Sequence, residues 1–335
     1  MPAPETWLKP TPEGLYCLPG GFHIDPVRPV PRAVVTHGHG DHARAGNGAV
    51  LATPETLAIM ESRFGAEAGG SLQALRYGET LAERDVRLTL APAGHVLGSA
   101  QVVLEHRGTR IVVSGDYKRR PDPTCAPFEP QRCDVFVTEA TFGLPVFRHP
   151  PDAQEIERLL HSLRLYPDRC HVVGVYALGK CQRVLSLLRR HGYAEPVFIH
   201  GGLKEMCALY ERFGVALGPL LPATGAARED LAGRLILAPP SATADLWTRR
   251  MPDPVVALAS GWMRVKQRAK ARGVELPLVI SDHADWDELT QTLGEVGAGE
   301  IWVTHGREEA LIRQAGLMGL KARALALGGF EDEAE

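Results

Sequence analysis

Short apolar runs separated by glycine and proline turns make up most of residues 15–140. The alternating segment 101–104 and the continuous apolar run 111–113 are typical of strands. Residues 54–64 differ from their surroundings, because the spacing of their apolar positions predicts a helix. The first part of the chain therefore predicts a sheet-rich domain that carries a helix.

From about residue 152 the pattern changes to alternating helices and strands. Apolar positions at helical spacing predict helices over 153–164, 179–190 and 203–213, and short apolar runs predict strands over 171–175 and 197–200. Residues 219–228, which contain proline and glycine, are expected to form a loop. Strands that alternate with helices indicate a small parallel α/β unit.

Composition agrees with a folded catalytic protein. The 335 residues are 44% hydrophobic and 23% charged, enough to bury one large core or two moderate ones, so two lobes are expected. The start lacks a secretory signal, and no apolar run approaches the roughly 18 residues that span a bilayer, so we expect a cytoplasmic protein without membrane association. The six cysteines form no C-x-x-C pair, which argues against disulfides and a thiolate zinc site.

The segment 36–42 is the strongest chemical signal in the chain. It places three histidines and one aspartate within six positions, directly after the apolar run 33–35. Glycine-spaced residues at a strand end let His37 and His39 project from the same side, while Asp41 and His42 turn toward a second position. One ion would leave ligands unused, so the segment predicts a dinuclear metal site, with a solvated histidine-rich loop as the alternative.

A dinuclear site needs about three more ligands, one of them a bridging carboxylate. His95 precedes the strand predicted at 101–104, Asp116 follows the run 111–113, and His305 follows the apolar run 301–303. A carboxylate at the end of a buried strand is costly unless it is paired or binds a metal. Each residue alone can also be a satisfied polar group at a strand end, but together they complete a ligand set.

The ordered set from His37 to His305 resembles the metallo-β-lactamase superfamily. Within it, residues 137–143 (VTEATFG) and 280–285 (ISDHAD) resemble two motifs of the β-CASP nucleases, and residues 176–182 (YALGKCQ) resemble the start of the helix after the first of them. The opening segment 7–17 and the short length resemble bacterial ligase-associated DNA exonucleases. The resemblance spans roughly residues 15–310.

The resemblance implies an α/β fold, an αββα metallo-β-lactamase sandwich with a small inserted α/β β-CASP domain. The expected limits are residues 1–154 and 266–335 for the first domain and 155–265 for the second. It also implies two divalent ions, zinc or manganese. The ligands of the first ion would be His37, His39 and His95, those of the second Asp41, His42 and His305, with Asp116 bridging both.

Two such ions lower the pKa of a bridging water and clamp phosphate oxygens, which predicts a phosphodiesterase. Asp25 matches the first motif of the family and is expected to accept a hydrogen bond from the hydroxide or to orient a ligand, although it can also be a turn former before Pro26. His283 is expected to be the general acid, with Glu139 accepting its other ring proton. The alternative is that Glu139 and His283 only hold the two lobes together.

Charge restricts the substrate less than the metal ligands do. A net charge of −3 argues against a broad non-specific nucleic-acid binder, yet residues 249–272 contain seven basic residues and one acidic residue. The expected nucleic-acid contacts are Lys118, Arg119, Lys180, Arg264 and Lys266. Alternatively, the run 264–272 is a solvated helix face. Tyr117 and Trp262 are candidates for stacking on bases, with burial in the core as the alternative.

We therefore expect a metal-dependent single-strand DNA exonuclease that acts in DNA repair, from the 5′ end by family habit. The resemblance implies a DNA ligase and a helicase of the same pathway as partners. The alternative is a β-CASP ribonuclease, because a histidine at the third motif, as at His305, is associated with RNA-processing members. A non-catalytic scaffold would lack ligands, and none is missing here.

Overall fold

The structure, a computed structural model, describes residues 2–327. Within this range the chain forms two compact units. The first consists of residues 2–147 and 283–327, and the second consists of residues 148–282. None of the helices in the described range is long and apolar enough to cross a membrane.

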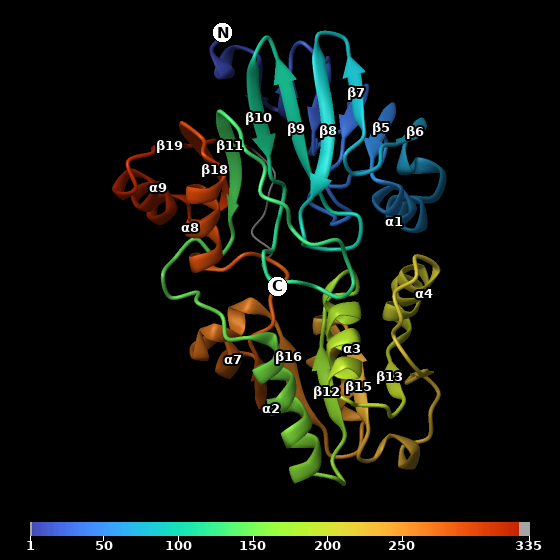
Figure 1. The fold of residues 1–335 in the computed structure, drawn as a ribbon. Helices are drawn as coiled ribbons and strands as arrows, with labels where there is room; N and C mark the ends of the chain where they lie inside the picture. Colours follow the sequence, from blue (N-terminus) through green and yellow to red (C-terminus); the bar gives the residue numbers. More distant parts are fainter. Residues whose placement is uncertain (1, 328–335) are drawn as a thin grey trace. The chain divides into compact units, whose positions relative to one another are not determined.

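The first unit contains two sheets (Figure 1). In the six-stranded sheet the strands follow chain order, antiparallel up to β3 and parallel afterwards. Its strands are β1 (Leu8–Thr11), β2 (Gly14–Cys17), β3 (Phe22–Ile24), β4 (Arg32–Val34), β5 (Ala49–Ala52) and β6 (Ser71–Ala74).

The seven-stranded sheet has the order β19-β18-β11-β10-β9-β8-β7. Strands β7 to β10 pair antiparallel, whereas β10, β11, β18 and β19 pair parallel. Its strands are β7 (Thr80–Glu83), β8 (Val86–Pro92), β9 (Ala100–His106), β10 (Thr109–Val113), β11 (Val135–Ala140), β18 (Glu300–Gly306) and β19 (Lys321–Ala324). Parallel pairing brings the carboxyl ends of β10, β11 and β18 to one edge of this sheet.

Strand alternation separates the side chains of the first unit into layers. Trp302 joins a core built from both sheets, while its neighbours Ile301 and Val303 join a second core with α8 (Trp286–Glu295) and α9 (Glu308–Leu317). A third core packs α1 (Pro54–Phe64) on the outer face of β4 and β5. The order helix, sheet, sheet, helix confirms the predicted αββα sandwich.

Helix α1 begins and ends where local chemistry directs it. The Thr53 side chain accepts a hydrogen bond from the Thr56 backbone N–H, Pro54 occupies the first turn, and Gly65 follows the last residue at φ 55°. These signals explain why the helix predicted over 54–64 is confirmed with the same limits.

The second unit is built on a six-stranded sheet, parallel throughout, in the order β14-β13-β15-β12-β16-β17. Its strands are β12 (His171–Gly174), β13 (Val197–Ile199), β14 (Leu220–Pro222), β15 (Leu235–Ala238), β16 (Val255–Ala259) and β17 (Leu276–Leu278). Its helices are α2 (Asp152–Leu165), α3 (Lys180–Arg190), α4 (Lys204–Arg212), α5 (Pro240–Thr243), α6 (Leu246–Arg249) and α7 (Lys266–Ala271). The predicted parallel α/β unit is confirmed, and the expected helices and strands lie within one or two residues of these limits.

Two details of the second unit differ from the sequence analysis. The segment 219–228, expected to be a loop throughout, contains β14, where Pro222 is tolerated because the strand lies at the sheet edge. The compact units divide after Phe147 and after Asp282, whereas the expected domain limits were 154/155 and 265/266. The second limit differs because β17 hydrogen-bonds to β16 and so joins the sheet of the second unit.

Candidate metal centre

The predicted ligands gather in the first unit, where strand ends of both sheets supply them. His37, His39 and His42 follow β4 of the first sheet, Asp116 follows β10, and His305 lies near the end of β18. Gly115, at φ 57°, precedes Asp116, and a Cβ there would lie 2.8 Å from the Thr36 Cβ. The glycine therefore permits close approach of the two loops, one from each sheet.

Asp116 lies between two sets of histidines. Its Oδ2 atom lies 3.5 Å from His37 Nε2, 3.3 Å from His42 Nε2 and 3.9 Å from His95 Nε2. Its Oδ1 atom lies 3.7 Å from His305 Nδ1. One carboxylate thus contacts both predicted ligand sets, as a bridging ligand must.

The candidate ligands form two overlapping groups. In each group the nearest ligand atoms lie within 4.8 Å of one another. The first group is His37, His39, His95 and Asp116, and the second is His42, Asp116 and His305. Asp41 lies beside the second group rather than in it, with its Oδ2 atom 3.6 Å from His42 Nε2.

The donor atoms fit divalent first-row metals. His37 is fully buried, and its Nε2 atom has no hydrogen-bond partner among residues 2–327, although Asp116 lies nearby. Such an orphaned buried nitrogen is unfavourable unless something binds it. Burial lowers the pKa of His37 well below its usual value, and the neighbouring imidazoles of His42 and His95 lower it further. His37 is therefore neutral, which metal ligation requires.

Asp25 contacts Thr36 and the candidate ligand His42, and so orients both. Its Oδ1 atom accepts the Thr36 backbone N–H at 2.7 Å, and its Oδ2 atom accepts the Thr36 hydroxyl at 2.6 Å. The same Oδ2 atom lies 2.8 Å from His42 Nδ1. Because Asp25 engages Nδ1, His42 presents Nε2 toward Asp116. These contacts fit the second of the two expected roles, orientation of a ligand.

In the metal-free protein the pKa values of His42 and Asp116 shift in opposite directions. Burial alone lowers the pKa of His42, but the carboxylates of Asp116 and Asp25 hold it well above its usual value. Burial raises the pKa of Asp116, yet His42 and His305 hold it well below its usual value. His42 and Asp116 therefore form an imidazolium–carboxylate pair when no cation replaces the proton.

His283 and Glu139 form a second hydrogen-bonded pair beside the ligands. His283 Nδ1 lies 3.0 Å from Glu139 Oε2, and Glu139 Oε1 accepts the Tyr117 backbone N–H at 2.7 Å. The rings of His283 and His95 are 4.6 Å apart, and both residues of the pair are buried. Asp116, Glu139 and His283 also lie within 4.8 Å of one another. The predicted general acid thus lies beside the candidate metal ligands and next to its predicted partner.

The candidate nucleic-acid contacts lie in different environments. Lys118 is buried, with 1% exposure, and the Arg119 guanidinium binds Glu295 at 2.7 Å. Lys180 is also buried, with its ammonium 2.9 Å from Asp282 Oδ2. Arg264 and Lys266, in contrast, are exposed.

The two aromatic candidates for base stacking also differ. Tyr117 has no exposed surface and stacks on Phe128 at 4.9 Å, so the core alternative is confirmed for this residue. Trp262 is half-buried, and the Arg268 guanidinium lies 4.2 Å from its ring centroid. An indole partly open to solvent keeps the stacking role of Trp262 a prediction.

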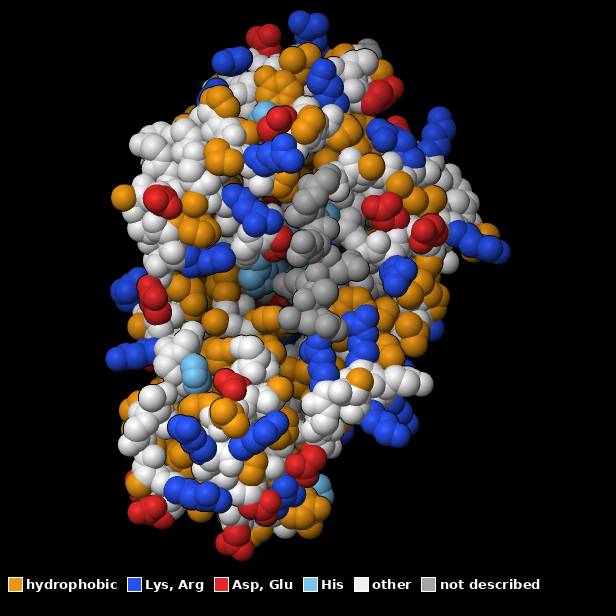
Figure 2. Space-filling view, turned by 180° about the vertical axis from the view of Figure 1, so that it is seen from behind, with side chains coloured by type: hydrophobic (Ala, Val, Ile, Leu, Met, Phe, Trp, Pro, Cys, Tyr) orange, Lys and Arg blue, Asp and Glu red, His pale blue; other side chains and the backbone are white. Residues whose placement is uncertain are grey.

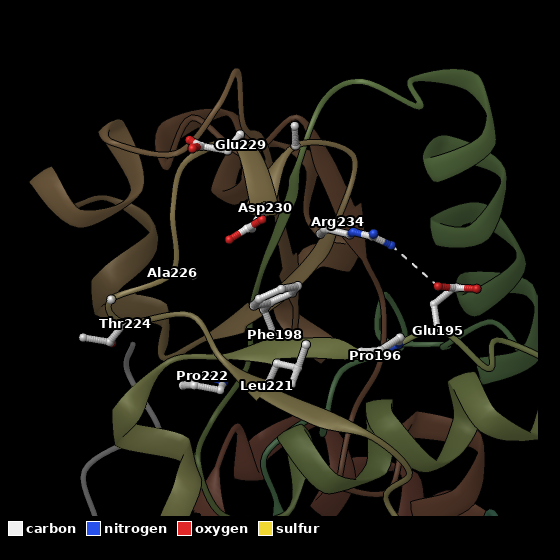
Figure 3. Close-up of a pocket in the computed structure, with 12 residues that line it drawn as sticks. Glu195, Pro196, Phe198, Leu221, Pro222, Thr224, Ala226, Glu229, Asp230 and Arg234 are labelled. Carbon is white, nitrogen blue, oxygen red and sulfur yellow. Dashed lines mark ion pairs between the residues drawn. The ribbon is translucent and has the colours of Figure 1, made fainter.

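A cavity of about 690 Å³ lies in the second unit and is lined by residues between Glu195 and Arg234 (Figure 3). None of the candidate metal ligands lines it. Its floor is the Phe198 ring beside Leu221, and its charged lining consists of Glu195, Glu229, Asp230 and Arg234. Arg234 pairs with Glu195 at 3.6 Å, which leaves two uncompensated carboxylates. Such a lining repels phosphate groups, so the cavity does not fit a nucleic-acid backbone.

The surface charge is mixed on the face that Figure 2 shows. Lysine and arginine side chains are interspersed there with acidic and hydrophobic ones. This distribution agrees with the small net charge of −3. The described residues therefore form no broad basic surface on this face.

The structure also identifies residues that sequence reasoning missed. Thr36 links Asp25 to His37, because its hydroxyl lies 3.0 Å from His37 Nδ1 as well as donating to Asp25. Its position directly before His37 was the only available signal. Arg63 of α1 contacts the segment 36–42 from outside, and nothing in the sequence pairs it with that segment.

Comparison with known proteins yields a family model and several relatives. Residues 24–174 match the model described as metallo-beta-lactamase superfamily. A probable DNA ligase of Opitutus terrae is 30% identical over 321 residues, covering 93% of this chain and 30% of the relative. Cleavage and polyadenylation specificity factor subunit 3 of Dictyostelium discoideum is 31% identical over 146 residues, covering 42% of this chain and 18% of the relative. The chain thus spans less than a third of either relative.

Two further similarities extend over most of the chain. A ribonuclease of Thermus thermophilus is 26% identical over 401 residues, covering 92% of this chain and 88% of the relative. A solved structure, of a protein of unknown function from Enterococcus faecalis, matches with a TM-score of 0.58 at 12% identity, covering 89% of this chain and 80% of that one. At that identity the structural match supports the fold alone.

Proposed function

Since the chain belongs to the metallo-β-lactamase superfamily and to its β-CASP group of nucleases, we propose that it is a metal-dependent single-strand DNA exonuclease. The observation that carries the nuclease part is the position of Asp116, whose Oδ2 atom lies within 3.9 Å of three histidine nitrogens while Oδ1 faces His305. A carboxylate between two histidine sets suits two divalent ions, zinc or manganese.

In this proposal each candidate ligand has an assigned ion. His37, His39 and His95 hold the first ion, Asp41, His42 and His305 hold the second, and Asp116 bridges them. When bound, the two ions would activate a water molecule and neutralise charge on the phosphate. Asp25 keeps His42 in the tautomer that offers Nε2, through its 2.8 Å contact with Nδ1.

His283 is proposed to protonate the leaving oxygen. Glu139 accepts the Nδ1 proton and orients the ring, which leaves Nε2 to carry the proton that is transferred. Both residues are buried, so bulk water does not compete for this contact. The role explains why a histidine that the ligand count does not need lies against His95.

DNA as the substrate is supported by the relative named a probable DNA ligase, whose match extends over 93% of this chain. From the resemblance to ligase-associated exonucleases we also propose a role in DNA repair, 5′ polarity, and a DNA ligase and a helicase as partners. The exposed cations Arg264 and Lys266 are proposed to contact the phosphate backbone.

The second candidate function is RNA processing as a β-CASP ribonuclease. Two observations favour it: His305 faces Asp116 in the cluster, and a relative named a ribonuclease matches this chain over 88% of its own length. Both functions use the same ligands and general acid. Only the substrate distinguishes them.

The deciding experiment is hydrolysis of matched single-stranded DNA and RNA oligonucleotides, labelled at the 5′ or the 3′ end, with zinc, manganese or magnesium. Asp116→Ala is the control for contaminating nucleases and should leave every substrate intact. Release of mononucleotides from DNA but not from RNA would support the exonuclease and show its polarity. Efficient cleavage of RNA with intact DNA would replace the proposal by the second candidate.

A further inference from the structure

One face of helix α1 lies against the segment 36–42, which carries four of the candidate ligands. Gly38 separates His37 from His39, and Gly40 separates His39 from Asp41. Ile59 and Arg63, four residues apart and therefore on the same face of α1, contact these two glycines. Neither Ile59 nor Arg63 belongs to the ligand set.

The contacts are close enough to fix the backbone. A Cβ at Gly38 would lie 2.5 Å from Ile59 Cγ2, and a Cβ at Gly40 would lie 2.9 Å from Arg63 Nη2. Arg63 Nη1 donates a hydrogen bond to the Gly38 carbonyl at 2.5 Å. The guanidinium thus spans both glycines, with one nitrogen on Gly38 and the other beside Gly40.

Other contacts hold Arg63 in this position. Its guanidinium carbon lies 5.0 Å from the centroid of the Phe64 ring, within the range of a cation–π contact. The guanidinium is therefore held by the Gly38 carbonyl and by the Phe64 ring, while the residue as a whole stays exposed.

We propose that Arg63 is a positioning residue for the metal centre. By holding the Gly38 carbonyl, it sets the backbone between His37 and His39, and so the spacing of two ligands of the proposed first ion. A planar guanidinium suits this task better than an ammonium, because its fixed fork places Nη1 on the Gly38 carbonyl while Nη2 lies beside Gly40. The inference rests on the metal-binding part of the proposed function and is independent of the nucleic acid that is cleaved.

The test measures metal affinity, without any nuclease assay. The metal-free wild-type protein, Arg63→Lys and Arg63→Met are titrated with zinc in competition with a chromophoric chelator. Arg63→Met should weaken binding of the first ion by roughly 10-fold, the low end of effects for residues that orient metal ligands. Arg63→Lys should fall between Met and wild type. Arg87→Met, an exposed arginine of the same unit, is the matched control and should bind zinc like the wild type.

A double-mutant cycle with Gly40→Ala sharpens the test. The added Cβ would displace Nη2, and the three atoms nearest to it all belong to Arg63. Gly40→Ala should therefore weaken zinc binding in the wild type, but have little further effect together with Arg63→Met. Full additivity of the two changes would overturn the proposal.

Three other results would also contradict it. Unchanged zinc affinity of Arg63→Met with a raised KM for an oligonucleotide would make Arg63 a substrate contact. Tighter zinc binding would show that its charge opposes the metal. A drop in the thermal midpoint of metal-free Arg63→Lys, relative to Arg87→Met, would mean that Arg63 supports the fold instead. If the wild type itself binds no divalent metal, the proposed function fails first.

Discussion

At the scale of single residues, His283 and the candidate metal ligands are expected to have separate roles. His283→Ala should lower the hydrolysis rate by about 100- to 10,000-fold, the usual contribution of a general acid, and leave the metal content unchanged. The reason is that Nδ1 is held by Glu139 at 3.0 Å, and the proposed ligand set is complete without His283. Metal analysis of the purified variant checks the second half of the prediction.

The leaving group offers a control for this role. A substrate with a nitrophenolate leaving group needs no proton, so His283→Ala should slow its hydrolysis much less than that of an oligonucleotide. His39→Ala, which removes a ligand, should affect both substrates alike. Equal losses for both substrates in His283→Ala, or loss of metal from it, would rule out the general-acid role.

The imidazolium–carboxylate pair leads to a prediction for pH. In the metal-free protein the pKa of His42 is raised and that of Asp116 is lowered, so His42 keeps its proton above its ordinary titration range. An ion must displace this proton, and apparent metal affinity should therefore rise with pH from 6 to 8. Calorimetry in buffers of different ionisation enthalpy should detect proton release. Binding without proton release and with constant affinity over this range would contradict the assigned charge state.

Contacts between residues of one short segment could be predicted from the sequence, whereas contacts that depend on packing could not. The histidines and Asp41 of 36–42 were predictable because their spacing along one chain segment nearly defines a site. The link from Asp25 to His42 was open to two interpretations, since it depends on which nitrogen faces the carboxylate. The contact between Arg63 and Gly38 was not predictable, because only the packing of α1 on the first sheet brings them together.

At the scale of elements, the spacing of apolar residues was sufficient to predict helices that bury one face. Helix α1 has strong start and stop signals and was predicted with its exact limits, whereas β14 was missed. A three-residue edge strand has too few positions to show alternation, and proline and glycine dominate its surroundings. Its pairing with β13 is a long-range effect that local pattern does not encode.

The cap at the start of α1 is expected to contribute to the stability of the first unit. Thr53 caps the helix and its hydroxyl lies 2.7 Å from the Gly98 carbonyl, so it joins α1 to the loop after His95. Thr53→Ala should lower the free energy of unfolding by about 1–2 kcal/mol, as measured by urea denaturation of the metal-free protein. Thr290→Ala, at a half-buried threonine of the same unit whose hydroxyl donates to the Asp287 carbonyl of its own helix, should change it by less than about 0.5 kcal/mol. Equal effects of the two substitutions would show that the cap contributes nothing specific.

At the scale of the whole molecule, the two units were predictable as fold types but their limits were not. The change from sheet-rich pattern to alternating helices and strands is visible along the chain, and both fold types are confirmed. The return to the first unit was expected too early because residues 266–278 continue the helix–strand alternation of the second unit as α7 and β17. The spacing of apolar residues along the chain does not show which of two sheets a strand will join.

The net charge of −3 does not favour binding of a nucleic acid, so affinity for one has to come from a local group of cations. If the exposed cations of α7 contact the phosphate backbone, then Lys266→Glu with Lys270→Glu should weaken binding of single-stranded DNA to the inactive Asp116→Ala protein at low salt. The slope of log affinity against log salt should also become shallower, by roughly 0.7 for each lost phosphate contact. Fluorescence anisotropy from 50 to about 300 mM salt measures both quantities.

The matched control for this prediction is Lys204→Glu on α4, which removes one exposed cation of the same unit outside the basic run. A non-specific effect of net charge would weaken binding in every variant in proportion to the charge added. A specific contact would affect the α7 variant much more than the change in charge alone accounts for. Equal loss per charge at both helices would return the run 264–272 to its alternative, a solvated helix face.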